Sequence, residues 1–404
     1  MKVRLLLLLL LACAVLTAKS FKSGSHALAY EIDKAKKSMK IIAETAYDPQ
    51  KDEGTSVYTL HWAPGTVFKI KNFVPFASVK PGTVCEIFLY KKDEQLLRQG
   101  KVFSTRRIEF DPAAKKVRVG IRPRKLIARV YPLGKGRGEI EFNGKRIKFR
   151  GPLTVGVFAK GSVDDIQKGE DKLRIWGKIS EKKFVISQVI ISREARPKLD
   201  PTLPSVLVIG DSISMNYEKA LQAALAKKMN CQRIEGNSGD SIRGNTALAM
   251  WLRDVPGAKS RWAVVVLNHG LHDLKQKADP KTKKFNPKHQ VEPDVYAKNI
   301  DRLLKYLTSR NYKVVWVTTT PVPGSSYGAF ARRKDEDLVY NKVLVPVLKK
   351  YPQVTVCDLN ATVRNSKVFD EWRKGTNVHF NKEEERKVLG DAVAAAVIKA
   401  YNKK

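Results

Sequence analysis

The chain has 404 residues, 43% of them hydrophobic, which is enough for two domains with ordinary apolar cores and excludes a disordered protein. Its formal net charge is +36, and the basic excess is spread along the chain instead of gathering in one patch. Because zinc-finger spacing, basic heptads and an aromatic-and-glycine RNA-binding signature are all missing, this charge argues against a nucleic-acid partner. It suits an acidic polysaccharide, an anionic surface or a simply solvated basic exterior.

The first eighteen residues have the layout of a secretory signal peptide. Lys2 and Arg4 precede an apolar run over residues 5–16, which is too short for a membrane span. We therefore expect residues 1–18 to be a signal peptide and the protein to be secreted or periplasmic. The residues before Cys13 also form an imperfect lipoprotein box, which leaves a lipid anchor at Cys13 as a second option.

Beyond this segment the cysteines are few and widely separated. They are Cys85, Cys231 and Cys357. Their odd number and long spacings fit neither a disulfide framework nor a set of metal ligands. We expect no metal and no other cofactor.

Residues 20–195 are filled by short runs that alternate apolar with charged residues, as half-buried antiparallel strands do. The runs cover residues 56–61, 66–70, 85–90, 107–110, 116–121, 127–131, 139–142, 153–158, 173–176 and 184–191. Turn signals such as Asn143-Gly144 lie between them. This spacing predicts an ancillary all-β domain, a β-sandwich or jelly roll. Residues 196–204 hold three prolines and are predicted to be a stiff linker.

From residue 205 to residue 404 the pattern changes to strands that alternate with helices. The predicted strands cover residues 205–209, 231–234, 262–267, 313–318 and 354–357. Five strands separated by helical stretches predict an α/β fold, a flavodoxin-like doubly wound parallel sheet with right-handed crossovers. The last helix is expected to begin after Asn381, with Glu384 completing a capping box.

The first of these strands leads into the stretch VLVIGDSIS over residues 206–214. Gly210 ends the apolar run, and residues at helical spacing follow, so that Ser212 falls in a tight turn between strand and helix. Ligands bind outside the carboxyl ends of parallel strands, where a helix N-terminus offers free N–H groups. Ser212 is therefore the candidate nucleophile.

Three further loops are predicted at the same edge of the sheet. The second strand is followed by a run of small residues around Gly239, and the third by Asn268-His269-Gly270-Leu271-His272-Asp273. His379 precedes the last helix. A serine, glycine N–H groups and a histidine in this order are the components of acyl transfer: nucleophile, oxyanion donors and general base.

Other polar residues of these loops are expected to have structural roles. Asp211 and Asp240 are expected to cap turns, and Asp273 to hold the third loop. His269 and His289 are expected to be surface or loop residues.

Four sequence blocks in this order resemble those of the SGNH, or GDSL-type, hydrolases. The blocks are Gly210-Asp211-Ser212, Ser238-Gly239-Asp240, Gly270-Leu271-His272-Asp273 and Val378-His379-Phe380. The resemblance covers about residues 204–404, roughly half of the chain, and a single block of this kind would be weak evidence. Four blocks in the family order, all predicted at one sheet edge, make it strong.

The resemblance implies that Ser212 attacks an ester carbonyl and that His379 takes its proton. It also implies an oxyanion hole built from the backbone N–H groups of Ser212 and Gly239. The third donor of the family is an asparagine, and His272 stands in its place here; imidazole can still donate an N–H. Asn268 is the alternative donor.

A second departure concerns the acid that usually orients the base. The family has an aspartate three residues before the histidine, and Thr376 stands there, followed by Asn377. Three explanations remain open. The imidazole of His379 is oriented by a backbone carbonyl, Asn377 or Thr376; or a carboxylate arrives from elsewhere, with Asp358 or Asp370 as candidates; or the domain is inactive and retained for binding.

Together these features predict a secreted serine ester hydrolase that removes O-acetyl or other short acyl groups from a polysaccharide. The positive charge of the protein would suit an acidic polysaccharide. Some two-domain carbohydrate esterases with a β jelly roll ahead of an SGNH domain are similar in architecture and also lack the acid. A lipid or small-ester esterase is one alternative, and a degenerate domain that binds carbohydrate or a surface is another. A stable membrane span is not expected.

Overall fold

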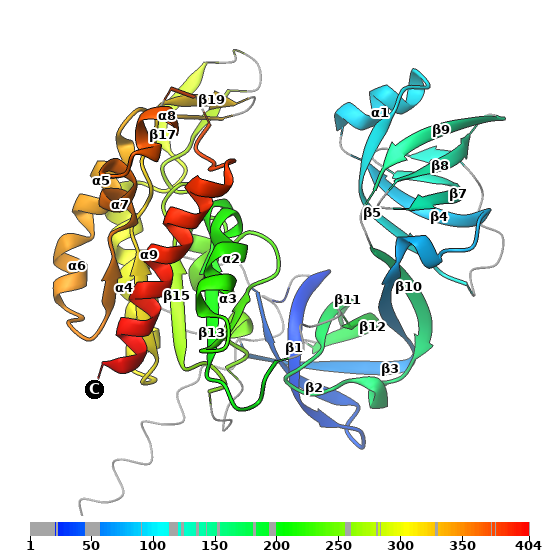
Figure 1. The fold of residues 1–404 in the computed structure, drawn as a ribbon. Coiled ribbons are helices and arrows are strands. Elements are labelled where there is room, and N and C mark those ends of the chain that lie inside the picture. Colours follow the sequence, from blue (N-terminus) through cyan, green and yellow to red (C-terminus); the bar gives the residue numbers. More distant parts are fainter. Residues whose placement is uncertain are drawn as a thin grey trace, which may run out of the picture. The chain divides into compact units, whose positions relative to one another are not determined.

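The computed structural model describes residues 21–403 except 22, 45–56, 90, 113–119, 123–124, 135–136, 143, 152–153, 181–182, 194–198, 255–259, 280–281, 283, 328–329, 373 and 376. The predicted signal peptide, Cys13 and Thr376 lie outside the described residues. The chain divides into two compact units, one over Val15–Ala43 and Val57–Pro197 and the other containing Lys198–Lys404 (Figure 1).

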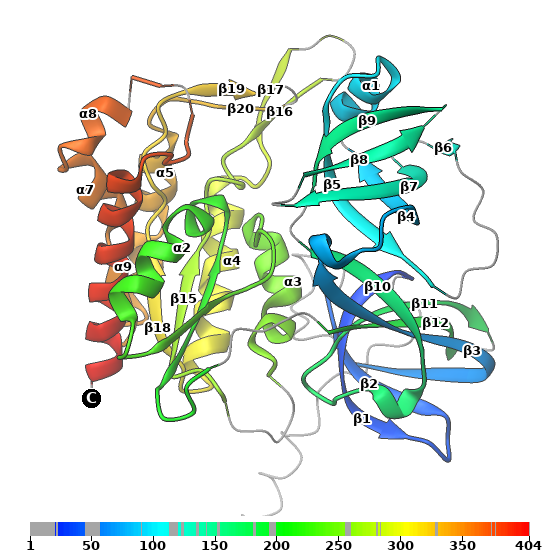
Figure 2. The ribbon, with the colours of Figure 1, turned by 45° about the vertical axis from the view of Figure 1, so that its right-hand side comes forward.

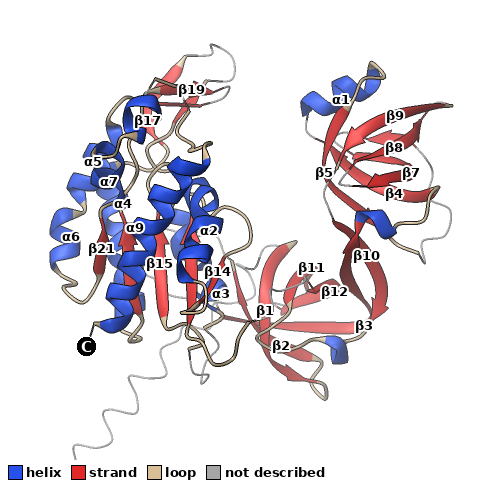
Figure 3. Ribbon diagram, in the orientation of Figure 1, coloured by secondary structure: helices blue, strands red, loops and turns tan. Residues whose placement is uncertain are grey.

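The first unit consists mostly of strands, as the alternating pattern predicts (Figure 3). They are β1 (Ser25–Asp33), β2 (Ser38–Ala43), β3 (Val57–Pro75), β4 (Thr83–Leu89), β5 (Phe103–Phe110), β6 (Gly120–Arg122), β7 (Lys125–Gly134), β8 (Arg137–Phe142), β9 (Lys145–Arg150), β10 (Thr154–Gly161), β11 (Lys172–Ser180) and β12 (Lys183–Arg193). A helix, α1 (Lys91–Arg98), and two 3₁₀ turns, η2 (Phe76–Ser78) and η3 (Val163–Asp165), interrupt them. The strands form one 12-stranded sheet in which β12-β11-β1-β2-β3-β10-β5-β4-β7-β8-β9 are neighbours, with β6 on β7.

Two separate apolar cores lie along this sheet. One gathers side chains of β1, β2, β11 and β12 around Tyr58 and Leu60 of β3. The other gathers β4, β5 and β7 to β9 around Phe103 and Phe149. The 19-residue strand β3 and the strand β10 pair over Phe68 to Pro75 and carry the sheet from one core to the other. A β-sandwich or jelly roll around a single core is therefore not confirmed.

The second unit contains the predicted five-stranded parallel sheet, in the order β14-β13-β15-β18-β21. Its strands are β13 (Ser205–Gly210), β14 (Asn230–Arg233), β15 (Val264–Asn268), β18 (Lys313–Val317) and β21 (Thr355–Cys357). Its helices are α2 (Ser212–Leu225), α3 (Ser241–Leu252), α4 (Pro293–Thr308), α5 (Glu336–Val343), α6 (Val345–Lys349), α7 (Leu359–Arg364), α8 (Val368–Trp372) and α9 (Glu383–Asn402).

Helices cover both faces of this sheet. Helices α2 and α9 lie side by side on one face, and α3 and α4 pair with each other on the other (Figure 2). The last helix begins one residue later than the sequence predicts, because Glu385 instead of Glu384 accepts the N–H groups of Asn381 and Lys382. Within the described part of the chain, no helix is long and apolar enough to span a membrane.

A second, small sheet was not predicted. Its strands β16 (Gln276–Ala278) and β17 (Phe285–His289) follow β15, whereas β19 (Ser325–Tyr327) and β20 (Phe330–Arg332) follow β18. They pair in the order β17-β16-β20-β19. Because both insertions leave the main sheet at the carboxyl ends of parallel strands, the small sheet stands at the edge that carries Ser212 (Figure 2).

Candidate active site

Ser212 is held by the tight turn between β13 and α2. Gly210 closes this turn, since a Cβ there would lie 2.7 Å from the Cβ of Ser214. Asp211 is the N-cap of α2 and accepts the N–H of Ile213 at 2.9 Å. Ser212 is thus the first residue of the helix, where the backbone N–H has no acceptor within the helix. The turn presents both a hydroxyl and a free N–H at one point.

His379 reaches this hydroxyl from the loop before α9. Its Nε2 lies 2.8 Å from the Oγ of Ser212, and its Nδ1 lies 2.8 Å from the Oδ1 of Asn377. The same Oδ1 accepts the backbone N–H of His379 at 3.1 Å, which holds the amide in place. The structure therefore joins Ser212, His379 and Asn377 in one hydrogen-bonded line.

This line selects one tautomer of the imidazole. An amide oxygen can only accept, so Nδ1 of His379 carries the proton and donates it to Asn377. Nε2 then has its lone pair toward Ser212, which is the form that a general base needs. Burial lowers the pKa of His379, and the positive charges of Arg332 and Lys275 lower it further, so the neutral form is favoured.

The carboxylates considered as replacements for the missing acid lie elsewhere. The Oδ1 of Asp358 accepts the N–H of Ala361 at 3.0 Å and the hydroxyl of Thr318 at 3.1 Å, where it caps α7. Asp370 belongs to α8, and the hydrogen-bond partners of His379 among the described residues are Ser212 and Asn377. Of the candidates that the structure describes, only Asn377 contacts the imidazole.

Gly239 has a left-handed φ of 71°, and its N–H is already engaged. It donates to the Oδ1 of Asn237 at 2.8 Å, in a local turn. The expected role of Gly239 as an oxyanion donor therefore requires Asn237 to release this N–H.

His272 is held by the side chain of Lys275, a residue that was not predicted to belong to the site. Its Nδ1 lies 2.9 Å from the Nζ of Lys275. An ammonium group only donates, so Nδ1 accepts and the proton of the neutral ring is on Nε2. Burial, followed by the Lys275 charge, lowers the pKa of His272 to about 3. His272 is thus a neutral imidazole whose Nε2 carries one N–H to donate.

Asn268, the alternative donor, is buried at the end of β15. Its Nδ2 donates to the carbonyl of Val317 at 3.3 Å, and its Oδ1 has no hydrogen-bond partner among the described residues. The amide thus contacts the neighbouring strand β18.

The three aspartates have the predicted structural roles. Asp211 and Asp240 cap α2 and α3, and Asp273 accepts both the N–H and the hydroxyl of Ser241, which ties the third loop to α3. His269 lies in the loop after β15, as expected, although its side chain is fully buried. His289 is neither a loop nor a surface residue: it ends β17, where Glu292 and Glu336 lie on either side of its largely buried ring.

Two cations beside the site, Lys275 and Arg332, escaped sequence reasoning. Each lies next to or within a three-residue strand, too short to show a period. The nearest signal is Lys275 itself, three residues after His272, but a lone lysine in a basic chain does not stand out.

Residues 208–386, which include Ser212 and His379, match the model of the GDSL-like lipase/acylhydrolase family. The C-terminal half carries a GDSL-like lipase/acylhydrolase domain. No curated protein matches the sequence. Among solved structures, the chain is similar to the lipase/acylhydrolase from Enterococcus faecalis, with 15% identity over 48% of this chain and 94% of that chain and a TM-score of 0.38.

Two further solved structures are similar to the GDSL-like domain. The C-terminal catalytic domain of peptidoglycan O-acetyltransferase A from Streptococcus pneumoniae has 19% identity over 50% of this chain and 97% of that chain, with a TM-score of 0.34. An acetyl xylan esterase has 17% identity over 48% of this chain and 99% of that chain, with a TM-score of 0.36.

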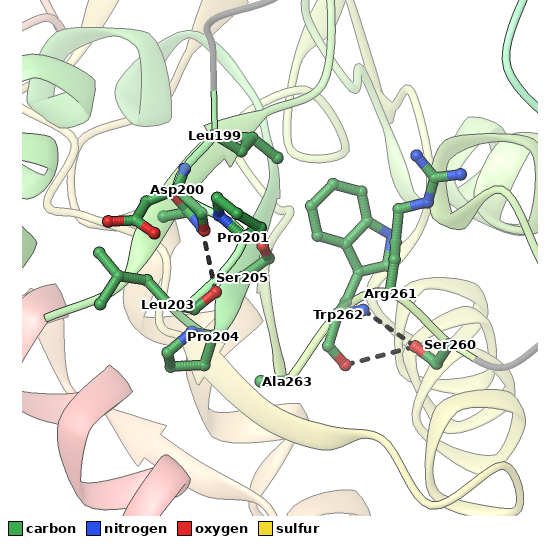
Figure 4. A pocket seen from close by; sticks show the side chains of 11 residues that line it. Leu199, Asp200, Pro201, Leu203, Pro204, Ser205, Ser260, Arg261, Trp262 and Ala263 are labelled. Carbon is green, nitrogen blue, oxygen red and sulfur yellow. Dashed lines mark hydrogen bonds between the residues drawn. The ribbon is translucent and has the colours of Figure 1, made fainter.

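A cavity of about 380 Å³ lies at the other end of the GDSL-like domain's sheet. Pro201 of the predicted linker and Trp262 line it, together with Ser205, the first residue of β13 (Figure 4). Ser212 comes two residues after the opposite end of the same strand, so this cavity is separate from the candidate active site. Among the described residues, no group of three or more His, Cys, Asp or Glu side chains is placed to hold a metal ion.

Proposed function

We propose that this protein is a secreted serine ester hydrolase that removes O-acetyl or other short acyl groups from a polysaccharide. The observation that carries the proposal is the hydrogen-bonded line from Ser212 through His379 to Asn377, with 2.8 Å at each of its two contacts. A hydroxyl, a base in the correct tautomer and a group that orients the base are what acyl transfer requires. Asn377 takes the place of the usual carboxylate.

In the first half of the reaction, the Oγ of Ser212 bonds to the carbonyl carbon of the ester while its proton passes to Nε2 of His379. The resulting imidazolium is held by the bond from its Nδ1 to Asn377. When the tetrahedral intermediate collapses, the bond between carbon and the sugar oxygen breaks. His379 returns the proton to that oxygen, which leaves as an alcohol, and the acyl group stays on Ser212.

In the second half, water attacks the acyl-serine. His379 takes a proton from the water, a second tetrahedral intermediate forms, and its collapse returns the proton to the Oγ of Ser212. The acyl group leaves as a carboxylic acid, which ionises at neutral pH, and the enzyme is restored.

Each tetrahedral intermediate carries a negative oxygen that needs donors. The backbone N–H of Ser212 at the start of α2 is one, and the Nε2–H of His272 is the second in this proposal. The N–H of Gly239 joins them if the oxyanion displaces Asn237 as its acceptor. A neutral His272 can donate without adding a charge to the resting site.

The decisive experiment measures acetate release from acetylated xylan, acetylated pectin and para-nitrophenyl acetate by the purified protein. Turnover that disappears in Ser212→Ala and in His379→Ala is expected. A protein that releases no acetate, or whose activity survives Ser212→Ala, contradicts the proposal. The alternative of an inactive binding domain would then gain support, although the intact contact between Ser212 and His379 weighs against it.

A further inference from the structure

Two positive side chains, those of Lys275 and Arg332, lie next to each other beside the candidate active site. In the small sheet, β16 and β20 are antiparallel, with Gln276 opposite Ala331. Lys275 directly precedes β16, and extending this register by one residue places it opposite Arg332. Both cations lie against one ring: the Nζ of Lys275 is 4.7 Å and the guanidinium carbon of Arg332 is 5.3 Å from the centre of Phe330. Like charges directly opposite each other destabilise a sheet, so this placement calls for a compensating function.

Neither cation is neutralised by an ion pair. Lys275 is 9% exposed and Arg332 is 8% exposed, yet within the described residues no carboxylate oxygen lies within 4.0 Å of either one. Burying an unpaired charge is costly unless something compensates it. Burial, followed by the charge of Arg332, lowers the pKa of Lys275 to about 8, and burial lowers that of Arg332 to about 10.

The hydrogen bonds of Lys275 and Arg332 do not use all of their N–H donors. Lys275 donates to Nδ1 of His272 at 2.9 Å, and the Nε of Arg332 donates to the carbonyl of Leu271 at 2.9 Å. No described residue accepts a hydrogen bond from the two terminal nitrogens of Arg332. Those nitrogens form the planar fork that matches a carboxylate.

The cations act on the reacting groups. Both lower the pKa of His379, and both are close enough to Asp211 to oppose the rise that burial causes in its pKa. Asp211 uses Oδ1 to cap α2, and it forms no ion pair with either cation. The two cations therefore place positive charge beside His379 that no direct ion pair with Asp211 neutralises, and a bound anion would complement it.

Resting on the proposed esterase function, we propose that Lys275 and Arg332 bind a carboxylate carried by the same molecule as the scissile ester. The preferred substrate class is then an O-acylated polymer of sugar acids, in which each ester lies close to a carboxylate. Arg332 supplies the fork, and Lys275 supplies a charge while it holds His272.

The test compares one polymer in two charge states. O-acetylated polygalacturonate and the same material with its carboxyl groups converted to methyl esters are given to the enzyme, and kcat/KM for acetate release is measured for each. The wild-type enzyme should prefer the charged polymer. In Arg332→Gln that preference should fall by roughly 10- to 100-fold, the loss expected for a charge-assisted bidentate pair. Arg332→Lys keeps the charge but not the planar fork, so its preference for the charged polymer should lie between those of the wild-type enzyme and Arg332→Gln.

Arg333 offers a matched control, because it is the exposed neighbour of Arg332 and loses the same charge in Arg333→Gln. That variant should keep the wild-type preference. If Arg332→Gln lowers turnover of both polymers equally, the cation stabilises the reaction and not the carboxylate, and the inference fails. It also fails if the wild-type enzyme hydrolyses both polymers alike.

Para-nitrophenyl acetate separates this outcome from a failure of the proposed function. Hydrolysis that depends on Ser212, without preference for the charged polymer, overturns the carboxylate site alone. If the wild-type enzyme hydrolyses none of the three esters, the proposed function fails as well. Binding of trigalacturonate to Ser212→Ala, measured by calorimetry, should be lost in the double variant with Arg332→Gln; equal binding by both proteins contradicts the carboxylate site whatever the turnover.

Discussion

Replacing Asn377 by aspartate should strengthen the base. Asp keeps an oxygen where the Oδ1 of Asn377 now lies 2.8 Å from Nδ1 of His379, and it adds a negative charge beside the imidazolium that forms during the reaction. Two unit charges about 4 Å apart attract by about 1 kcal/mol in water and about 4 kcal/mol at an effective dielectric constant of 20. Because Asn377 is exposed, the lower value applies, and kcat should rise by about 5-fold.

The pH profile supplies an independent readout. A negative charge favours the protonated form of His379, so the acidic limb of kcat/KM should move to higher pH in Asn377→Asp. In Asn377→Ala the imidazolium loses its acceptor, and kcat should fall by about 10- to 100-fold, as expected for about 1.5–3 kcal/mol from a hydrogen bond to a charged group. Both are measured with para-nitrophenyl acetate between about pH 5 and pH 9.

Asn381→Asp makes the same change of charge two residues beyond His379, at an exposed side chain. Its kcat and pH profile should stay close to those of the wild-type enzyme. If Asn377→Ala and Asn377→Asp both behave like this control while remaining folded by circular dichroism, Asn377 does not orient the base.

Three further outcomes follow from the structure. His272→Ala should lower kcat by roughly 100-fold if Nε2–H is an oxyanion donor, and His272→Asn should recover part of this loss; an unchanged rate would remove the role. Arg332→Met should move the acidic limb of kcat/KM on para-nitrophenyl acetate to higher pH, because the guanidinium charge lowers the pKa of His379, and a limb that stays in place would contradict this coupling. Gly390→Val should destabilise the domain by about 1–3 kcal/mol in urea unfolding, because even a Cβ at Gly390 would lie 2.5 Å from a Cβ of α2. The control Ala395→Val, on the exposed side of α9, should lower the free energy of unfolding by only about 0.5 kcal/mol. Equal losses in these two variants would show that the close packing of α2 on α9 does not limit stability.

Local sequence patterns were sufficient to predict the parallel sheet of the second unit and the proximity of Ser212 and His379. Its strands are continuous apolar runs, and the helices between them show their own period, so local patterns suffice. The carboxyl ends of parallel strands share one edge, which brings Ser212 and His379 together although 167 residues separate them. The capping role of Asp211 in its turn is equally local and was predicted for the same reason.

The group that orients the imidazole of His379 could be identified only from the folded structure. Asn377 lies two residues from His379, and Asp358 and Asp370 are further along the chain, but sequence distance does not indicate which side chain reaches Nδ1. The hydrogen bonds of the folded protein show which one does. Asp358 accepts an N–H group at the start of α7, whereas the Oδ1 of Asn377 accepts the backbone N–H of His379.

The small sheet and the two cores of the first unit also required the fold. Lys275 and Arg332 become neighbours because β16 pairs with β20 across a long stretch of intervening chain. Pairing between such short strands depends on where the main sheet places their ends. The periodicity of the local sequence does not indicate this pairing. Likewise, alternation along the strands of the first unit predicted which faces are apolar but not that they close around two cores instead of one. The sequence contains the nucleophile and its base, and the tertiary structure supplies the partner of the base and the charges around them.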